Sequence, residues 1–270
     1  MREVAVVTGA NRGIGFHIVL RLARELSQDS VVYLCSRDYC RGQQAAKEIP
    51  SELRRKVQVM QLDVTDPKSV TAVVDKLSQQ HPTGVDILIN NAGSNPRVDN
   101  PESRDHQAKE TLAVNYYGTK LVTQAMFPLL SPGSRVVNVC SKAGCTKWWT
   151  PEKRAELLRP ELDLNGLESL VSAYVSDTAV GMAFANGWPK SHFAVSQAAK
   201  LALTRVYSKA FSSKGVVVVA CCPGWCWTDL GGTRAPKTAS EGADTPAWLA
   251  TTSQSDSSGR FYSDRKEVPY

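Results

Sequence analysis

A glycine-rich segment near the start of the chain, TGANRGIG at Thr8 to Gly15, has the residue types and spacing to bind a phosphate group. It directly follows an apolar run at residues 3–7 and opens an amphipathic segment at residues 15–27. Glycines in such a turn permit a close backbone approach to a pyrophosphate, and the following helix presents the positive end of its dipole. Because strand, glycines and helix come in the required order, the segment predicts dinucleotide binding rather than a simple structural turn.

Three arginines indicate which dinucleotide this segment would bind. Arg37 and Arg41 follow a second apolar run at residues 30–35, and Arg12 lies inside the glycine segment. Guanidinium groups suit a ribose 2′-phosphate, whereas an acidic residue at the end of the second strand suits a free 2′-hydroxyl. The arginines therefore favour NADP(H) over NAD(H). The alternative is that Asp38 binds the ribose and that Arg37 and Arg41 are solvated surface charges.

The alternation of β-branched runs with amphipathic segments predicts the elements that position these residues. Strands are expected at 3–7, 30–35, 56–61, 85–90, 135–140 and 216–221, and helices at 15–27, 67–80, 102–130 and 191–213. Near-continuous apolar strands joined by helical crossovers are typical of a parallel sheet covered on both faces. We expect an α/β fold, a Rossmann-type doubly wound parallel sheet of about seven strands with helices on both faces.

The alternating pattern of strands and helices continues along the chain and is interrupted by one long segment. No composition break or internal repeat marks a second unit, so residues 1–270 are expected to form a single domain. Residues at about 145–189 separate the fifth strand from the next long helix by far more than a normal loop. We interpret this segment as a partly helical insertion.

Composition excludes several classes of protein. The 270 residues are 42% hydrophobic and 21% charged, which excludes disordered, collagenous and coiled-coil chains. No apolar run approaches the roughly 18 residues that span a bilayer, and an apolar strand begins with no room for a signal peptide before it, so a cytoplasmic protein is expected. Seven cysteines without a CxxC pair predict neither a disulfide framework nor a metal site. The net charge of +6 is scattered, so no nucleic-acid partner is expected.

Further motifs, together with TGANRGIG, resemble those of the short-chain dehydrogenase/reductase superfamily. They are Asp63 in LDVTD, NNAG from Asn90, VNYYGT around Asn115, VVNVCS ending at Ser141 and CCPGW from residue 221. The similarity covers essentially the whole chain. The 52-residue step from Ser141 to position 193, the GWP at 187–189 and the EGADTP from residue 241 resemble the monomeric carbonyl reductases. In that group the insertion covers a helix face that dimerises in ordinary members, so a monomer is expected.

The resemblance implies roles for particular residues. Asp63 would hold the adenine amino group, Asn115 a relay water, and Ser141 the substrate oxygen. The cofactor-binding residues indicated by the glycine segment, the arginines and the resemblance are Gly9, Asn11, Arg12, Gly13, Ile14, Gly15, Arg37, Arg41, Asp63, Val64, Asn90, Ala92, Gly93, Pro223, Gly224 and Thr228.

The main departure from the family pattern is at the residues expected to carry out catalysis. The family's catalytic tyrosine and lysine, a YxxxK pair, correspond to Phe193 and Gln197 in SHFAVSQAAK. Hydride delivery to a carbonyl leaves an alkoxide that needs a proton, and phenylalanine has none to give. Glutamine keeps hydrogen bonding but lacks the charge that lowers a tyrosine pKa. Loss of a general acid typically costs about 10² to 10⁴ in rate.

No other residue clearly replaces the missing pair. Tyr116 and Lys120 match YxxxK as a string but lie beside Asn115 on the preceding helix, so we interpret the match as coincidence. His192 points about 100° around the helix from position 193, where a surface or capping role is expected. Lys200 returns to nearly the same helical face, and its ammonium could partly reach the vacated lysine position.

Three interpretations follow from this departure. The sequence favours a catalytically impaired, NADP(H)-binding pseudoenzyme with a structural or regulatory role in a larger protein assembly. The alternative is an active NADPH-dependent reductase of aldehydes, ketones or quinones that uses Ser141, water and Lys200. A third is that Phe193 and Gln197 were engineered into an active reductase, which leaves fold and cofactor unchanged. Tryptophans such as Trp225 and Trp227 suit either a protein-facing surface or an aromatic substrate pocket.

Overall fold

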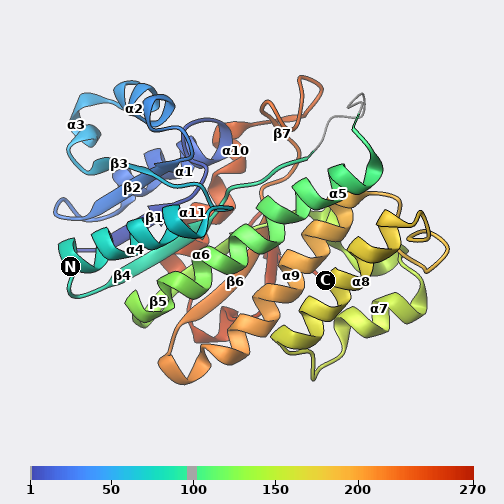
Figure 1. Cartoon of the computed structure of the whole chain (residues 1–270). Coiled ribbons are helices and arrows are strands. Elements are labelled where there is room, and N and C mark those ends of the chain that lie inside the picture. The colour runs from blue at the N-terminus through green and yellow to red at the C-terminus, as the bar shows by residue number, and fades with distance from the viewer. Residues whose placement is uncertain (1, 96–101) are drawn as a thin grey trace.

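The computed structural model describes residues 2–95 and 102–270, and its centre is a sheet of eight strands (Figure 1). The strand order is β10-β9-β6-β5-β4-β1-β2-β3. Seven strands run parallel, and short β10 pairs antiparallel with β9. This confirms the predicted fold class. The bounds are β1 Val4–Val7, β2 Val31–Ser36, β3 Val57–Gln61, β4 Val85–Asn90, β5 Leu130–Val139, β6 Val217–Cys222, β9 Phe261–Ser263 and β10 Lys266–Glu267.

Helices cover both faces of the sheet because its strands are apolar on both sides. In β1, Val4 and Val6 belong to one buried cluster, while Ala5 and Val7 belong to another. The helices over the first cluster are α4 (Pro67–Gln80), α5 (Arg104–Leu112), α6 (Thr119–Met126) and α9 (His192–Ala210). Those on the second side are α1 (Gly13–Glu25), α2 (Tyr39–Lys47), α3 (Ser51–Arg54), α10 (Ala239–Gly242) and α11 (Asp244–Thr252).

The helix predicted at 102–130 differs from the observed element in its centre. α5 and α6 are joined by a π-helical turn at Ala113–Gly118, and the chain leaves α6 through a 3₁₀ turn at Phe127–Leu129. Strand β5 therefore begins at Leu130, earlier than predicted. Single π turns inside helices are frequent at functional sites, and this one contains Asn115.

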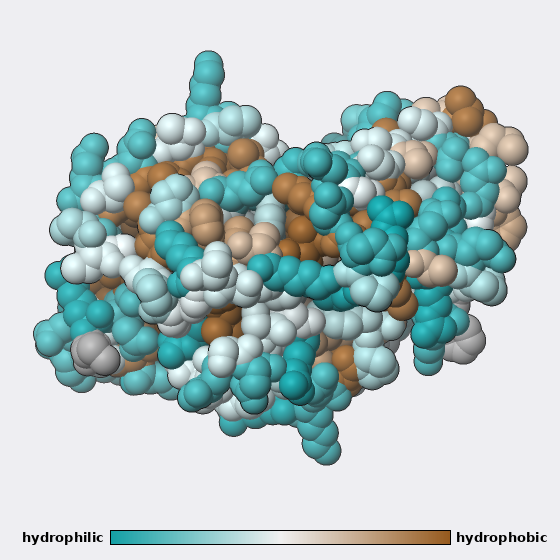
Figure 2. All heavy atoms as spheres, turned by 90° about the horizontal axis from the view of Figure 1, so that it is seen from below, coloured by the Kyte–Doolittle hydropathy of each residue, from teal (hydrophilic) through white to brown (hydrophobic). Residues whose placement is uncertain are grey.

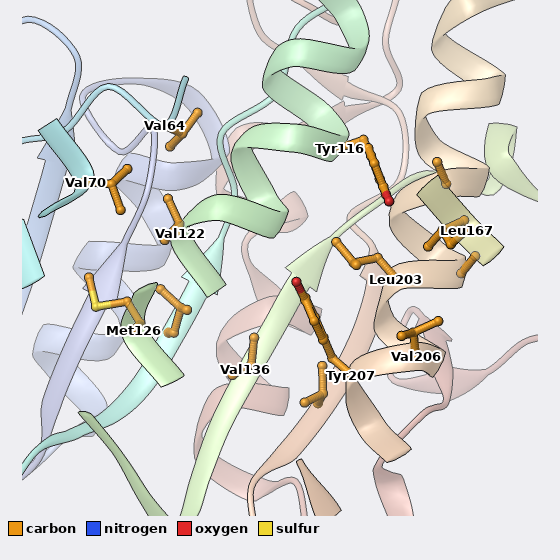
Figure 3. Packing of buried hydrophobic residues seen from close by; sticks show 14 of the residues in the cluster. Val64, Val70, Tyr116, Val122, Met126, Val136, Leu167, Leu203, Val206 and Tyr207 are labelled. Carbon is orange, nitrogen blue, oxygen red and sulfur yellow. The ribbon is translucent and has the colours of Figure 1, made fainter. Parts of the chain in front are cut away.

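The predicted insertion is partly helical, as expected. It contains α7 (Pro151–Leu158) and α8 (Leu164–Ala179), preceded by 3₁₀ turns at Lys142–Gly144 and Thr146–Trp148. Its apolar residues join the core on which α9 packs, as Leu167 beside Leu203 and Val206 shows in Figure 3. The insertion thus reinforces α9 from outside the sheet.

The remaining elements form the surface near the carboxyl ends of the strands. β7 (Cys226–Trp227) and β8 (Lys237–Thr238) pair in a separate two-stranded ribbon after β6. Short 3₁₀ turns lie at Ser212–Lys214 and Ser255–Ser257. Polar and apolar residues alternate over the face seen in Figure 2. Among the described residues, no helix is both long and apolar enough to pass through a membrane.

Candidate active site

The glycine segment forms the turn between β1 and α1 and packs closely against the residues that follow β4. Gly9 has φ of +62°, a conformation that side chains rarely adopt. A Cβ added there would lie 2.9 Å from Cα of Ala92. A Cβ on Gly15 would lie 2.4 Å from Nδ2 of Asn91. Glycine is therefore required for this close approach to the segment after β4, and the predicted approach to a pyrophosphate stays a prediction.

Asn91 clamps the glycine turn, a role that the sequence reasoning missed. Its Nδ2 donates to the carbonyl oxygens of Thr8 at 2.9 Å and Gly9 at 3.0 Å. The amide of Ala92 donates to Oγ1 of Thr8 at 3.0 Å. These bonds join the ends of β1 and β4. Helix α1 then begins with no side-chain cap and no acidic residue in its first turn, so its amino end suits a phosphate.

The arginines predicted to recognise the 2′-phosphate lie at the exposed end of β2. Asp38 caps helix α2 by accepting from the amide of Arg41 at 3.0 Å, and its other oxygen lies 3.7 Å from Nε of Arg41. The carboxylate is thus used locally, which disfavours the alternative in which Asp38 binds the ribose. Arg37 and Arg41 are exposed and can reach a ligand.

Arg12 has a partner across the site. It forms an ion pair with Asp229, which follows β7 in the segment after β6. Nearby, the methyl carbon of Thr228 would lie 3.2 Å from a Cβ on Gly13. The structure therefore brings the predicted residues Gly13 and Thr228 together and places an acidic residue beside Arg12.

Asp63 and Val64 lie at the carboxyl end of β3. Oδ1 of Asp63 accepts from the amide of Thr65 at 2.9 Å and its hydroxyl at 2.7 Å, which uses one carboxylate oxygen in the turn. Val64 packs against the π-helical turn, where a Cβ on Gly118 would lie 2.8 Å from its Cγ2. The adenine contact predicted for Asp63 stays a prediction.

Asn90 is positioned differently from the expectation. Its Nδ2 donates to Oγ1 of Thr123 at 2.9 Å and to Oδ1 of Asn138 at 2.8 Å. Asn138 continues the chain of amides by donating to Oγ1 of Thr204 on α9. The buried side chain of Asn90 therefore links β4, β5, α6 and α9, and the cofactor contact predicted for Asn90, Ala92 and Gly93 stays a prediction.

Asn115 is fully buried and bound on both sides. Its Nδ2 donates to the carbonyl of Ser94 at 2.8 Å and to Oγ of Ser196 at 2.9 Å, and its Oδ1 accepts from the amide of Ser94 at 2.7 Å. Ser196 passes its own hydrogen to the carbonyl of Phe193 at 2.8 Å. The side-chain amide of Asn115 thus joins the π turn, the end of β4 and α9, and the relay-water role predicted for this residue stays a prediction.

Ser141 follows β5 and caps the 3₁₀ turn at Lys142–Gly144, whose Gly144 packs on α9, the helix that carries Phe193 and Gln197. Ser141 Oγ accepts from the amide of Ala143 at 3.1 Å, so its own hydrogen can be donated. Phe193 is half-buried in the first turn of α9. Gln197, 4% exposed, packs on Gly144, and its buried Oε1 has no hydrogen-bond partner among the described residues. Such an orphaned acceptor fits a hydroxyl donor such as a cofactor ribose.

The residues considered as replacements for the family tyrosine and lysine are buried and have structural partners. Burial raises the pKa of Tyr116, whose ring packs in the core with Tyr207 (Figure 3), and Lys120 pairs with Glu168 on α8. The YxxxK string is therefore structural. His192 is 8% exposed and its Nδ1 lies 2.6 Å from the hydroxyl of Tyr174, so the expected surface or capping role is wrong. The insertion covers it.

Comparison with known proteins places this arrangement in a family. The model of the family "short chain dehydrogenase" matches residues 3–150. Carbonyl reductase [NADPH] 1 of Sus scrofa is 36% identical over 99% of this chain and 94% of its own length. The corresponding protein of Rattus norvegicus is 35% identical over 100% and 99%.

Solved structures agree over the whole length. Salutaridine reductase from Papaver somniferum has a TM-score of 0.86 at 28% identity, covering 97% of this chain and 99% of that one. Menthone neomenthol reductase from Mentha piperita has 0.84 at 32%, covering 98% and 100%. NADPH-bound carbonyl reductase from chicken fatty liver has 0.72 at 26%, covering 100% and 99%. The fold, the glycine turn and these similarities together establish that the chain belongs to the short-chain dehydrogenase family.

Proposed function

We propose that this protein is an NADPH-dependent reductase of carbonyl compounds, with aldehydes, ketones or quinones as substrates. The observation that supports the proposal is a cradle suited to a phosphorylated dinucleotide: the glycine turn held by Asn91, an uncapped α1 and exposed arginines after β2. The relatives named as NADPH carbonyl reductases cover nearly the whole chain. They favour an active reductase over the pseudoenzyme that the sequence reasoning preferred.

Ser141 is the residue that would bind the oxygen of the substrate carbonyl. A bound NADPH supplies the hydride. Ser141 Oγ accepts from the amide of Ala143, which leaves its hydroxyl hydrogen free to be donated to a substrate oxygen, where it would stabilise negative charge. Phe193 has no proton to give, so water must protonate the alkoxide. We therefore expect turnover about 10² to 10⁴ slower than with a tyrosine in place.

Steady-state NADPH oxidation with a reactive quinone and a small activated aldehyde tests the proposal. The parent chain should show slow, saturable turnover, and Ser141→Ala should lower it at least about tenfold. Ser169→Ala, at an exposed position of helix α8, is the matched control and should leave the rate unchanged. If NADPH binds but neither substrate is reduced above the uncatalysed rate, the pseudoenzyme interpretation replaces this one.

We also propose that the chain is a cytoplasmic monomer. Support comes from α8, which packs on α9 through Leu167 and Tyr174 and covers the outer side of that helix. Light scattering at micromolar concentration should give a mass near 29.4 kDa. A stable species of twice that mass contradicts the monomer, and membrane-bound protein after cell fractionation contradicts the location.

A further inference from the structure

The ion pair between Arg12 and Asp229 joins the glycine turn to the segment after β7. Arg12 is the residue immediately before helix α1, whose amino end has no side-chain cap. Both side chains of the pair are exposed. The Arg12 guanidinium therefore binds a carboxylate at the helix end that is suited to a phosphate.

The turn after β7 fixes the position of Asp229. Within this turn, the amide of Gly231 donates to Oγ1 of Thr228 at 3.0 Å. On its other side, Thr228 faces the glycine turn, where a Cβ on Gly13 would lie 3.2 Å from its methyl carbon. Because Thr228 lies against Gly13, the next residue along the chain, Asp229, is placed within reach of Arg12.

This pairing occupies a cation that a dinucleotide phosphate would use. A carboxylate and a phosphate accept hydrogen bonds from the same guanidinium N–H groups. Among the described residues, Asp229 is the acid within ion-pair distance of Arg12, and the first turn of α1 contains no other. Two anions held at one guanidinium also repel each other. A phosphate that binds Arg12 must therefore displace Asp229.

We propose that Asp229 sets the affinity for the cofactor by holding Arg12 in the free protein until a cofactor phosphate displaces it. The proposal rests on the proposed function, because it needs a bound dinucleotide. The displacing group is either the pyrophosphate, which NADPH and NADH share, or the 2′-phosphate, which only NADPH carries. Displacement also removes the ionic contact between the turn after β7 and the glycine turn, so cofactor binding is linked to the position of that turn. Asp229 acts through Arg12 and is a positioning residue.

The test is the dissociation constant, Kd, of NADPH and of NADH, measured by calorimetry at pH 7 and low ionic strength. Asp229→Asn should tighten NADPH binding about three- to fivefold, the range expected when one exposed ion pair no longer competes. Asp229→Glu keeps the carboxylate and should bind NADPH within about twofold of the parent. If NADH binding tightens equally, the pyrophosphate displaces Asp229; if only NADPH binding tightens, the 2′-phosphate does.

Asp75→Asn is the matched control, because it changes the net charge equally. Asp75 is exposed on α4, which lies over the opposite face of the sheet from α1. This variant should bind both cofactors as the parent does. The gain from Asp229→Asn should shrink at about 0.5 M salt, because exposed charges are screened. A gain independent of salt contradicts competition between charges.

A double-mutant cycle shows whether Asp229 acts through Arg12. Arg12→Gln should weaken NADPH binding, and in that background Asp229→Asn should have no further effect. An equal gain with and without Arg12 means that Asp229 repels the cofactor directly, which overturns the proposal. So does an unchanged Kd for both cofactors in Asp229→Asn, while the parent still binds and oxidises NADPH. If the parent binds neither cofactor, the proposed function fails and this inference fails with it.

Discussion

Nδ2 of Asn115 donates to Oγ of Ser196 across 2.9 Å and so ties the π-helical turn to α9 within one turn of Phe193. Both side chains are completely buried. Because Ser196 also donates to the carbonyl of Phe193, a single hydroxyl connects the turn to the residue predicted to stand in place of the family tyrosine. These buried bonds connect the first turn of α9 to the π-helical turn.

Ser196→Ala should lower the free energy of unfolding by about 1–2 kcal/mol, because one hydrogen of the buried Asn115 amide loses its acceptor. Urea unfolding followed by circular dichroism measures the change. Exposed Ser213→Ala should stay within about 0.5 kcal/mol of the parent. A Ser196 variant as stable as that control would show that Asn115 finds another partner.

Phe193→Tyr combined with Gln197→Lys should raise kcat/KM for carbonyl reduction about 10² fold or more, whereas each single change should gain little. Tyrosine alone keeps a pKa near about 10, and lysine alone supplies charge without a proton. The pair should exceed the product of the singles because the two groups act as one unit. NADPH oxidation by the parent, both singles and the double measures this. A parent as fast as the double would mean that another proton source already suffices.

Arg37→Ala and Arg41→Ala should each weaken NADPH binding about tenfold while leaving NADH binding nearly unchanged, because only NADPH carries the 2′-phosphate. Fluorescence titration of both cofactors at one salt concentration gives the ratio. Arg24→Ala, in the last turn of α1, is the control for loss of surface charge. Equal losses for NADPH and NADH would assign the arginines to general electrostatics.

Stability should fall as the pH is lowered from 7.5 to 5.5. Burial lowers the pKa of His17, His81 and His192, and Arg104 lowers that of His192 further. Between the lowered pKa and the usual 6.5 the unfolded chain binds more protons, so the stabilisation is complete above 6.5 and is lost in acid. His192→Gln keeps a polar side chain that cannot titrate and should flatten the curve of unfolding free energy against pH. A curve as steep as the parent's would assign the effect to His17 and His81.

The sequence predicts the sheet and the glycine turn well because both depend on local order: β-branched runs, glycines at required positions and a helix start. The assignment of Phe193 and Gln197 to the positions of the family tyrosine and lysine rests on alignment by sequence position and stays a prediction. The π turn at Asn115, the inward amide of Asn90 and the burial of His192 could not be predicted in this way. Each depends on a partner far along the chain, such as Asn138 for Asn90 or Tyr174 for His192.

The hydrogen bonds from Asn91 determine whether the glycine turn can be transferred to another protein on its own. The carbonyl oxygens of Thr8 and Gly9 are satisfied by a side chain more than 80 positions away, so the glycine turn is half of a structure whose other half follows β4. Grafting TGANRGIG into another sheet transfers only that half. A chimera that exchanges the first two βα units should keep its nucleotide cradle only where the recipient has an asparagine at the position of Asn91. Among related chains, sequence changes in the glycine turn should therefore be correlated with changes in the segment after β4.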